Sequence, residues 1–452
     1  MGWGASSPHP RLSPLLELGS VRAVGAAVLF ARGAGFLAGG NLYRAMNDIC
    51  RVFRVAGKEP LKGAAGSIVR WMIGRLRRAE SPNILMQSYL ASGASGACAS
   101  LYSITGSGPH DIFRDLIVLK RASTDEKGVI LLKYARTFDA VIALFDLEKL
   151  LHRYIFVLEP CWAGYCDPSI LMYIQPGHPV FVQCFTEEDH AFIESIGLPL
   201  IPLRLGPADW VNTELFSRAP GGMKVYDLVM VANWEAHKRH AELFRALSRI
   251  KGRALRVLLV GFPLGNRTVQ DIRREASVIN NPMIDIEFRE KLPPHELADA
   301  VGQCKAFVFL SKKEGDNKAL VEAMFLNVPA IVYENTIGGA RSRINSSTGI
   351  LSSDEELPDR ILYMIDHYNE FRPRDWALRH TGSTISTRRL NEAIRERLHE
   401  LGQRFTEGIE EKTNSPNLDY KIPMCRHQLK SDYEYILACQ RFLNEPRSLG
   451  QR

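Results

Sequence analysis

Residues 307–325 read FVFLSKKEGDNKALVEAMF, and this stretch decides the fold class. A run of apolar residues leads into charged residues and a glycine. A second apolar segment then starts after Asp316-Asn317, whose side chains can cap a helix. The pattern predicts a buried strand, a turn and a helix. It recurs along this half of the chain, with candidate strands at 228–231, 256–260, 284–288, 306–310 and 330–333 and helical segments at 239–250, 267–279, 294–302 and 318–326. Short strands that are apolar on both faces and alternate with helices predict a parallel sheet covered on both sides.

A second series of short apolar runs precedes this one, and Gly221-Gly222 separates the two. Two such series predict an α/β fold with two Rossmann-like, doubly wound domains facing a cleft. We expect the first domain at 81–216, the second at 217–405, and residues 406–452 as a loop and a last helix (about 427–444) that pack back on the first domain. The candidate strands of the first series are 84–89, 116–119, 140–144, 154–158, 180–184 and 200–203.

The composition is that of an ordinary globular protein, with 46% hydrophobic and 24% charged residues among 452. It excludes a wholly disordered or collagenous chain. The eight cysteines are scattered, and their one close pair, Cys161 and Cys166, lacks the histidine or second pair that would complete a zinc site. We therefore expect a reduced, cytoplasmic protein without a metal, with ligation by this pair as the alternative.

Positive charge is concentrated at the start of the chain. Residues 1–80 contain 12 Lys or Arg and 4 Asp or Glu, whereas the rest contains 45 and 46. Residues 1–40 are expected to be loosely ordered, and two basic helices are expected at 42–55 and 64–78. Residues 41–78 could contact an anionic membrane surface, which would make the protein peripheral at the membrane's inner face. Alternatively, the helices pack on the first domain. The best apolar stretch, 23–30, is too short to span a bilayer, and no nucleic-acid partner is expected.

Polar residues at the carboxyl ends of parallel strands mark the crevice where such sheets bind ligands. Glu314 follows a strand directly, and Gly315 permits close backbone approach. Glu322 lies more than a turn into the next helix among apolar residues, where a carboxylate needs hydrogen bonds. Sugar or ribose hydroxyls could supply them, or a nearby Lys or Arg could form a structural ion pair; the sequence leaves both open.

Two other strand ends carry weaker signals. Lys238 and Arg239 lie in a strand-to-helix turn, where a cation can bind a phosphate or simply be solvated. Gly261 follows the next strand, but its surroundings lack the glycine spacing of a dinucleotide site.

Together these pieces resemble the family-four, group 1 glycosyltransferases of the GT-B fold, over residues 200–395. The specific part is Glu314 and Glu322 with seven residues between them, followed by Ala323-Met324 and Pro329. The individually weaker matches are Trp210-Val-Asn-Thr-Glu-Leu-Phe as a linker of Val-Asp-Thr type, Lys238, Gly261, Gly338-Gly339 and Thr348-Gly-Ile-Leu. Residues 83–200 fit the family's acceptor domain only in their alternation of short apolar runs with helical stretches. Residues 1–80 match nothing in the family.

The resemblance implies roles residue by residue. Glu314 would contact hydroxyls of a donor hexose, Glu322 the ribose, and Lys238 the pyrophosphate of a nucleotide-sugar. Gly338 and Gly339 would give a loop close access to the donor. The family retains anomeric configuration and generally needs no metal, in agreement with the absence of an Asp-x-Asp motif. The nucleotide-sugar is a co-substrate, so no cofactor is expected. The other donor-side candidates are Asn233, Arg239, Gly261, Gly315, Asn317 and Lys318.

Two departures from the family's pattern bear on activity. Ala232-Asn233 stands where the family has Gly-Arg, so one phosphate-binding cation is missing unless Arg239 or Lys318 replaces it. Asp316-Asn317-Lys318 stands where Phe-Gly is common, so the sugar preference cannot be carried over.

The richest strand end of the first domain, residues 154–168, reads YIFVLEPCWAGYCDP. Glu159 is expected to face the acceptor as a catalytic candidate, and Trp162 and Tyr165 could stack on a sugar; alternatively Glu159 caps a helix and the aromatic residues pack. His190 is a further acceptor-side candidate. The preceding Thr186-Glu-Glu-Asp is close to a capping box, which makes a surface role the simpler interpretation of His190.

The leading hypothesis is a retaining, metal-independent glycosyltransferase of the hexosyltransferase type, acting in carbohydrate or glycan biosynthesis. Lys238 and Glu314 would act at the donor and Glu159 at the acceptor, which would be a glycan, a lipid-linked molecule or a small molecule. One alternative is a nucleotide-sugar epimerase or hydrolase on the same fold. The other is a non-catalytic nucleotide-sugar-binding or glycan-binding protein, which Asn233 supports best.

Overall fold

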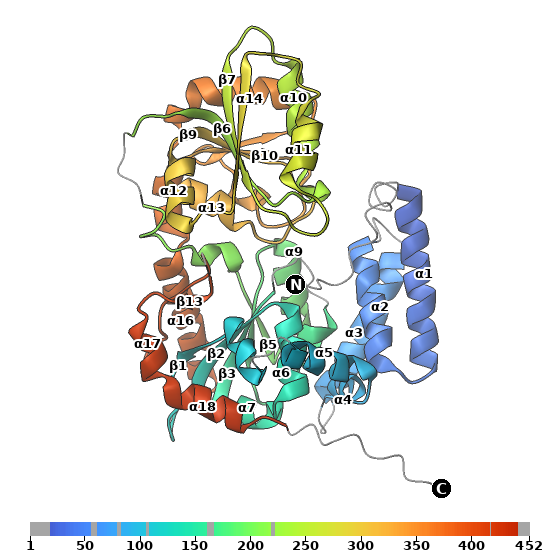
Figure 1. The fold of residues 1–452 in the computed structure, drawn as a ribbon. Helices are drawn as coiled ribbons and strands as arrows, with labels where there is room; N and C mark the ends of the chain where they lie inside the picture. The colour runs from blue at the N-terminus through green and yellow to red at the C-terminus, as the bar shows by residue number, and fades with distance from the viewer. Residues whose placement is uncertain are drawn as a thin grey trace.

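The computed structural model describes residues 19–55, 61–78, 83–104, 108–160, 167–217, 222–415 and 417–441. Two α/β domains lie one above the other in Figure 1, with a group of N-terminal helices beside the lower one. The predicted fold class, two Rossmann-like domains with a basic helical extension, is confirmed.

The second domain contains a six-stranded parallel sheet in the order β11-β10-β9-β6-β7-β8. The chain starts at β6, builds outward to β8, returns to β9 on the other side of β6 and ends at β11. This reversal is the doubly wound order that was predicted, with a switch point between β6 and β9. The strands are β6 (Tyr226–Val231), β7 (Leu255–Gly261), β8 (Ile284–Glu290), β9 (Cys304–Phe309), β10 (Ala330–Tyr333) and β11 (Gly349–Ser352). Strand β11 was not predicted, because only Ile350 and Leu351 in it are apolar.

Helices cover both faces of this sheet and form two separate cores. One core includes residues of α12, α13 and α15, and the other includes residues of α10, α11 and α14. The helices are α10 (His240–Arg249), α11 (Val269–Ala276), α12 (Pro294–Gly302), α13 (Lys318–Phe325), α14 (Leu357–His367) and α15 (Pro373–His380), with short 3-10 turns at η4 (Ala236–Lys238), η5 (Arg341–Arg343) and η6 (Tyr368–Glu370).

The first domain has a five-stranded sheet whose order follows the chain, β1 to β5. Strands β2 to β5 are parallel, and β1 pairs with β2 in the antiparallel direction. The described part of this sheet therefore has no switch point, unlike the doubly wound order predicted for it. The strands are β1 (Leu116–Lys120), β2 (Gly128–Lys133), β3 (Tyr154–Glu159), β4 (Val180–Gln183) and β5 (Leu200–Leu203).

Two predicted strands of this domain are helices, and one strand was missed. Residues 84–89 lie in α4 (Ile84–Leu90) and residues 140–144 in α6 (Ala135–Leu144). Short apolar runs do not separate a buried strand from a buried helix by periodicity. The start of α4 is fixed by the Asn83 side chain, which accepts hydrogen bonds from the Leu85 and Met86 amides. The missed strand is β2. The remaining helices here are η2 (Gly108–Arg114), α5 (Gly93–Ile104), α7 (Leu147–Arg153), α8 (Pro168–Leu171), α9 (Glu187–Ile196) and, in the linker, η3 (Pro207–Trp210).

The chain returns to the first domain before its end. Leu390, Ile394 and Leu398 of α16 belong to the first domain's core, so the crossing lies before Ser383 and not near residue 405 as expected. In α18, Tyr433 Oη accepts a hydrogen bond from the Val118 amide of β1. The return segment consists of α16 (Ser383–Glu400), β12 (Lys412–Thr413), β13 (Asp419–Tyr420), α17 (Met424–Gln428) and α18 (Lys430–Ala438).

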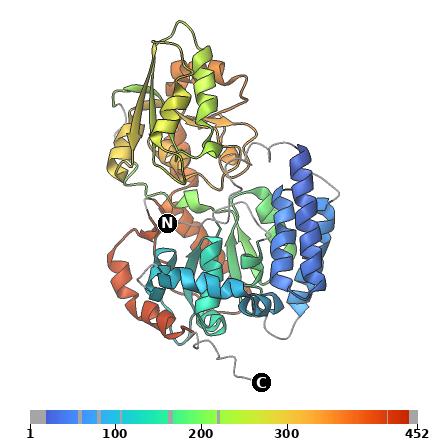
Figure 2. The same ribbon diagram turned by 45° about the vertical axis from the view of Figure 1, so that its right-hand side comes forward.

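The N-terminal helices stand beside the first domain, as the turned view of Figure 2 also shows. They are α1 (Gly19–Ala38), α2 (Leu42–Val55) and α3 (Leu61–Arg78). The expectation of a loosely ordered segment up to residue 40 is wrong from Gly19 onward, because Ala and Gly in α1 let it pack closely on α2. A Cβ on Gly33 would lie 2.8 Å from the Ile49 side chain. Residues of α2 and α3 enter the first domain's core, and none of the described helices is long and apolar enough to cross a bilayer.

Candidate active site

A narrow crevice opens at the carboxyl ends of β6 and β9, at the switch point of the second sheet. Its walls are Met230 to Ala232 and Val308 to Ser311, and its polar side chains include Lys238, Glu314 and Asn317. Open α/β sheets bind ligands at this point, because the loops from the two strands diverge and leave room between them.

Lys238 and Glu314 form an ion pair inside this crevice. Lys238 ends the turn η4, and the left-handed conformation of Arg239 (φ 63°) directs the chain into α10. The Lys238 Nζ atom lies 2.7 Å from Glu314 Oε1, and the two side chains are 10% and 18% exposed. The pair thus places one cation, from the turn after β6, beside one anion, from the loop between β9 and α13.

The second oxygen of Glu314 has unused bonding capacity. Its Oε1 atom also accepts a hydrogen bond from Asn317 Nδ2 at 2.9 Å. Its Oε2 atom is buried and has no hydrogen-bond partner among the described residues. An unsatisfied buried carboxylate oxygen is costly, and a hydroxyl group of a bound molecule would satisfy it.

The start of α13 is held by two adjacent residues in different ways. Asn317 is the N-cap, and its Oδ1 atom accepts a hydrogen bond from the Leu320 amide at 2.8 Å. Asp316, the other predicted cap, faces the linker instead and accepts a hydrogen bond from the Ala208 amide at 2.9 Å. The helix that carries Glu322 is therefore fixed to the linker between the domains.

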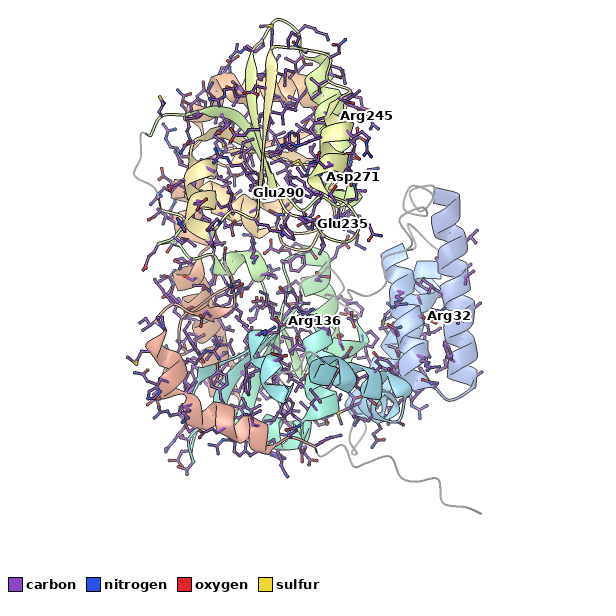
Figure 3. The ribbon with its side chains drawn as sticks, viewed as in Figure 1. Arg32, Arg136, Glu235, Arg245, Asp271 and Glu290 are labelled. Carbon is purple, nitrogen blue, oxygen red and sulfur yellow. The ribbon has the colours of Figure 1, made fainter. Side chains whose placement is uncertain are left out.

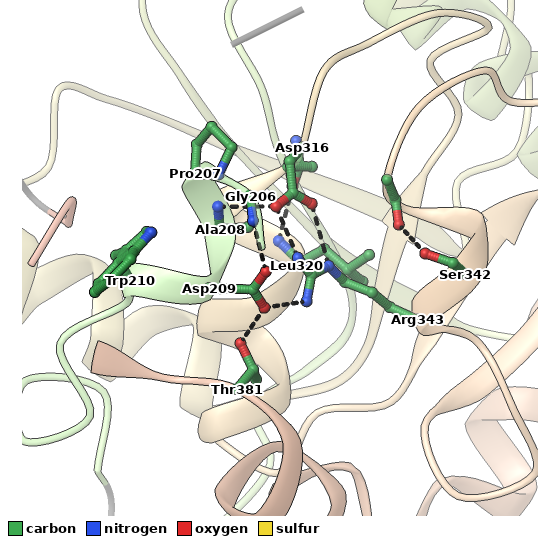
Figure 4. Close-up of polar contacts among 12 residues, drawn as sticks. Gly206, Pro207, Ala208, Asp209, Trp210, Asp316, Leu320, Ser342, Arg343 and Thr381 are labelled. Atoms are coloured by element: carbon green, nitrogen blue, oxygen red, sulfur yellow. Dashed lines mark hydrogen bonds and ion pairs between the residues drawn. The ribbon is translucent and has the colours of Figure 1, made fainter. Parts of the chain in front are cut away.

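Arg343 completes this connection (Figure 4). Its guanidinium donates to both oxygens of Asp316, at 3.1 and 2.7 Å, and to Asp209 Oδ1 at 2.9 Å. Thr381 Oγ1 donates to the same Asp209 oxygen at 2.6 Å. This network could not be predicted from the sequence, because Asp209, Asp316 and Arg343 lie far apart in the chain and no motif links them.

The Gly338-Gly339 loop lies directly against the backbone of Glu314 and Gly315. Gly338 has φ 135°, and a Cβ atom on it would lie 1.9 Å from the Glu314 carbonyl oxygen. The Gly339 amide donates to the Gly315 carbonyl at 2.9 Å. No other residue fits at Gly338 without moving the backbone next to the Glu314 carboxylate.

Glu322 is buried, and the return segment covers it. Ser415 Oγ donates a hydrogen bond to Glu322 Oε1. Burial raises the pKa of Glu322, although this hydrogen bond and Lys318 oppose the rise. In the described part of the chain no Lys or Arg lies within ion-pair distance of Glu322, and Lys318 donates instead to the Asn414 carbonyl at 2.9 Å. The structural ion pair left open by the sequence is thus absent from these residues.

Three predicted donor-side residues have other contacts. Arg239 donates to Asp354 at 2.5 Å and to the Leu310 carbonyl at 3.1 Å, and lies over the ring of Tyr333, so it does not replace the missing phosphate-binding cation. Asn233 Oδ1 accepts a hydrogen bond from the Glu235 amide. Gly261 is required by packing, because a Cβ atom there would lie 2.6 Å from the ring of Trp234.

Glu159 does not face an acceptor, contrary to the prediction. It is fully buried, and its two oxygens accept hydrogen bonds from Lys412 Nζ at 2.7 Å and Asn414 Nδ2 at 2.8 Å. Among the described helices it caps neither α7 nor α8, whose N-caps are Asp146 and Asp167. The neighbouring candidates Trp162 and Tyr165 lie outside the described residues.

His190 lies in the first turn of α9, after the Thr186 cap. Its Nε2 atom is 3.1 Å from Arg204 Nη1, and its Nδ1 atom is 3.9 Å from Glu194. No described group of three His, Cys, Asp or Glu residues has a geometry suited to a metal ion.

One family model matches most of the second domain. Residues 213–372 match the family model described as Glycosyl transferases group 1. The match contains Lys238, Glu314, Glu322 and the Gly338-Gly339 loop, so the resemblance drawn from the sequence is confirmed. No curated protein sequence matches the chain.

Several solved structures align with part of the chain at low sequence identity. Anabaena Alr3699/HepE in complex with UDP-glucose is 14% identical with a TM-score of 0.45, over 60% of this chain and 78% of that one. Sucrose-phosphate synthase from Thermosynechococcus elongatus is 13% identical with a TM-score of 0.47, over 60% and 74%. A TarM variant from S. aureus is 13% identical with a TM-score of 0.42, over 56% and 58%.

Proposed function

We propose that this chain, whose second domain matches the group 1 glycosyltransferases, transfers a hexose from a nucleotide-sugar to an acceptor hydroxyl with retention of configuration and without a metal ion. The donor binds in the crevice at the ends of β6 and β9. The acceptor binds between this crevice and the first domain. Retention and metal independence are taken from the family that the sequence resembles.

The observation that carries the proposal is the Glu314 carboxylate. One of its oxygens is paired with Lys238, and the other is buried without a described partner. A sugar hydroxyl donating to Oε2 would remove this cost. An apolar ligand would leave the oxygen unsatisfied, so the crevice favours a hydroxylated one.

The chemical step then requires charge stabilisation at the leaving group. The bond from the anomeric carbon to the nucleotide's phosphate oxygen breaks, and the acceptor oxygen bonds to the same face of that carbon. The acceptor's proton passes to the departing phosphate. Lys238 neutralises the negative charge that develops on the nucleoside diphosphate, assisted by amide groups at the start of α13. Glu322 lies on the same helix, where it holds the ribose.

One observation favours a second candidate, a protein that binds a nucleotide-sugar without transferring it. Lys238 is the one Lys or Arg among the described residues lining the crevice. Arg239 is engaged by Asp354, and Asn233 supplies no charge. With a single cation, leaving-group stabilisation is weaker than in the family's usual pattern.

A donor panel tests the proposal and separates the two candidates. Purified protein is mixed with UDP-, GDP- and ADP-sugars, and melting temperature and nucleotide release are followed. We expect stabilisation by one nucleotide class, lost in Glu322→Gln, and nucleotide release that Glu314→Gln abolishes. The exposed Glu355→Gln serves as a matched control and should behave like the wild type.

Each other outcome has a definite meaning. Binding without nucleotide release across a broad set of acceptors would favour the non-catalytic candidate. Conversion of the donor without any acceptor would indicate an epimerase or a hydrolase. No response to any nucleotide would refute the proposal, and Glu322 would then be a structural partner of Ser415.

A further inference from the structure

A basic cavity of about 670 Å³ lies next to the start of α13, and it is not part of the donor crevice. Residues of the first domain, the return segment and α13 line it. Its acidic lining residue is Asp115, against five Lys or Arg: Arg114, Lys133, Arg136, Lys318 and Arg426. In Figure 3, Arg136 lies at the end of the first domain that faces the second.

Lys133 is the central cation of this cavity. It ends β2 and is only 5% exposed. Its nearest strand neighbour is Glu159 of β3, which is in register with it. Both oxygens of Glu159 are already bonded, however, to Lys412 and Asn414. Lys133 forms no ion pair or side-chain hydrogen bond with the described residues, and its ammonium lies 4.9 Å from the centre of the Tyr134 ring.

Lys318, the first residue of α13, also lines the cavity and is half-buried. Its ammonium donates to a carbonyl group, at Asn414, and not to a carboxylate. Burial lowers the pKa of Lys318, and the nearby Lys133 lowers it further. A buried and a half-buried ammonium group that repel each other at the same cavity are costly, and an anion bound to both would offset that cost.

The other cations lie nearer the surface and have acidic neighbours. Arg136 binds Asp115 at 2.9 Å, and Arg426 lies 3.9 Å from Asp419. The excess positive charge is therefore concentrated where Lys133 and Lys318 face the cavity. Lys318 also opens the helix whose N-cap holds Glu314, so a molecule in this cavity lies beside the donor crevice.

We propose that this cavity binds an oxyanion, a phosphate or a carboxylate, carried by the acceptor, and that Lys133 and Lys318 are its principal ligands. This names the acceptor class of the proposed transfer and therefore rests on the proposed function. The anionic group sits at the ends of β2 and β3, and the acceptor's hydroxyl group points toward the donor sugar at Glu314. A neutral acceptor would leave the two ammonium groups without an ion-pair partner among the described residues, with Glu322 and Glu159 acting on Lys318 only from a distance.

Titration calorimetry with small charged and neutral probes tests this assignment. Glycerol phosphate and glucuronate are compared with glycerol and glucose, in the presence of whichever of UDP, GDP or ADP binds. We expect at least one charged probe to bind and both neutral probes to fail. Lys133→Met should weaken charged-probe binding by about tenfold or more, because charge-assisted hydrogen bonds are lost. Lys133→Arg should largely retain it.

Controls separate this inference from the proposed function. Lys149→Met removes a cation that is 67% exposed and outside the cavity, and should change nothing. Nucleotide affinity should be the same in Lys133→Met as in the wild type. If nucleotide affinity falls with that of the charged probe, the cavity holds the donor's diphosphate and the inference is overturned.

The inference also fails if neither charged probe binds to protein that still binds nucleotide, or if Lys133→Met leaves probe binding unchanged. Charged-probe binding through Lys133 in a protein that binds no nucleotide would refute the proposed function and leave the anion site standing. The choice between glycerol phosphate and glucuronate identifies the anionic group as phosphate or carboxylate.

Discussion

Glu159 and Lys412 join the first domain's sheet to the return segment, and removing either one tests whether Glu159 is structural. Both side chains are 0% exposed, and their charged atoms are 2.7 Å apart. Lys412 also donates to Asn414 Oδ1 at 3.0 Å and lies 4.0 Å from the centre of the Trp210 ring. The perturbations are Glu159→Gln, Lys412→Met and the two combined.

Lys412→Met should be strongly destabilising at every pH near neutrality. It leaves the Glu159 carboxylate buried with Asn414 as its one described partner. Removing one partner of a buried ion pair costs about 3–5 kcal/mol of unfolding free energy, because the remaining charge is uncompensated. The double variant removes both charges, so it should recover a large part of this loss.

Glu159→Gln should behave differently, because an uncompensated lysine can lose its proton. Burial already lowers the pKa of Lys412 from 10.5 to about 8, with Glu159 opposing that shift. Without Glu159 this pKa falls further. Keeping the folded lysine neutral then costs about 1.4 kcal/mol for each pH unit below its unfolded pKa, or roughly 5 kcal/mol at pH 7 and roughly 2 kcal/mol at pH 9.

The sign of the pH effect follows from these values. Between the lowered folded pKa and 10.5 the unfolded state binds more protons, so stability rises with pH in this range and is lost as pH falls from 10.5 to the folded pKa, below which it changes no further. Glu159→Gln should gain roughly 2–3 kcal/mol between pH 7 and pH 9 relative to Lys412→Met, which has no ammonium to titrate.

Urea unfolding of all four proteins at both pH values, followed by tryptophan fluorescence and circular dichroism, measures these differences. Equal pH dependence in the two single variants would refute the buried-pair reasoning. So would a Lys412→Met variant that loses less than about 1 kcal/mol, because the pair would then be solvated and not buried.

Three further perturbations probe other parts of the structure. Arg343→Met leaves Asp209 and Asp316 buried without their guanidinium and should cost about 3–5 kcal/mol, with Arg343→Lys rescuing only part, as calorimetry would show. Gly338→Ala should weaken donor binding and lower the melting temperature more than Gly252→Ala, because Gly252 has the milder positive φ (67° against 135°) and nothing within 4 Å of its Cβ position. Thr406 and Lys120 hold the pKa of Glu126 at about 2, so Glu126→Gln should lose about 1 kcal/mol at pH 7 after solvent screening, and its difference from wild type should shrink in acid unfolding between pH 4.5 and pH 2.

The second domain could be predicted from the sequence because the residues that mark each strand and helix are neighbours in the chain. Each of its central strands is an apolar run directly followed by a turn and a helix, so periodicity and position agree. Glu314 and Lys238 were found for the same reason: they follow strand ends, and strand ends meet at one edge of a parallel sheet. The structure places them 2.7 Å apart.

The first domain was predicted less well because its elements depend on their neighbours. The runs at 84–89 and 140–144 are short and largely apolar, and a helix and a strand of that length have the same composition. Its core includes residues of α16 and α18, which come from the end of the chain. No local pattern shows that a strand near residue 118 packs against Tyr433.

Glu159 illustrates the same limit at the level of one side chain. A carboxylate at a strand end was interpreted as a ligand group because its position matches that of Glu314. What distinguishes the two is a partner 253 residues away: Lys412 neutralises Glu159 completely, whereas Glu314 keeps one oxygen unpaired. The position of a polar residue is therefore predictable from the strand pattern, but its availability depends on contacts that only the folded chain supplies.

The segment from Lys412 to Ser415 connects these separate observations. Lys412 binds the first sheet at Glu159, Asn414 accepts a hydrogen bond from Lys318 through its carbonyl, and Ser415 donates to Glu322. Four consecutive residues thus contact the sheet of the first domain and helix α13 of the second.

Because the same short segment makes both contacts, a change in the relative position of the domains must alter its contact with Glu322 or its contact with Glu159. The buried pair at Glu159 is the costlier of the two to break, since both its charges lie out of water. Breaking the Ser415 contact only lets Glu322 exchange one neutral hydrogen-bond donor for another. Movement of the second domain would therefore break the Ser415 contact with Glu322 first. Glu322 is the carboxylate that the proposed function assigns to the donor's ribose.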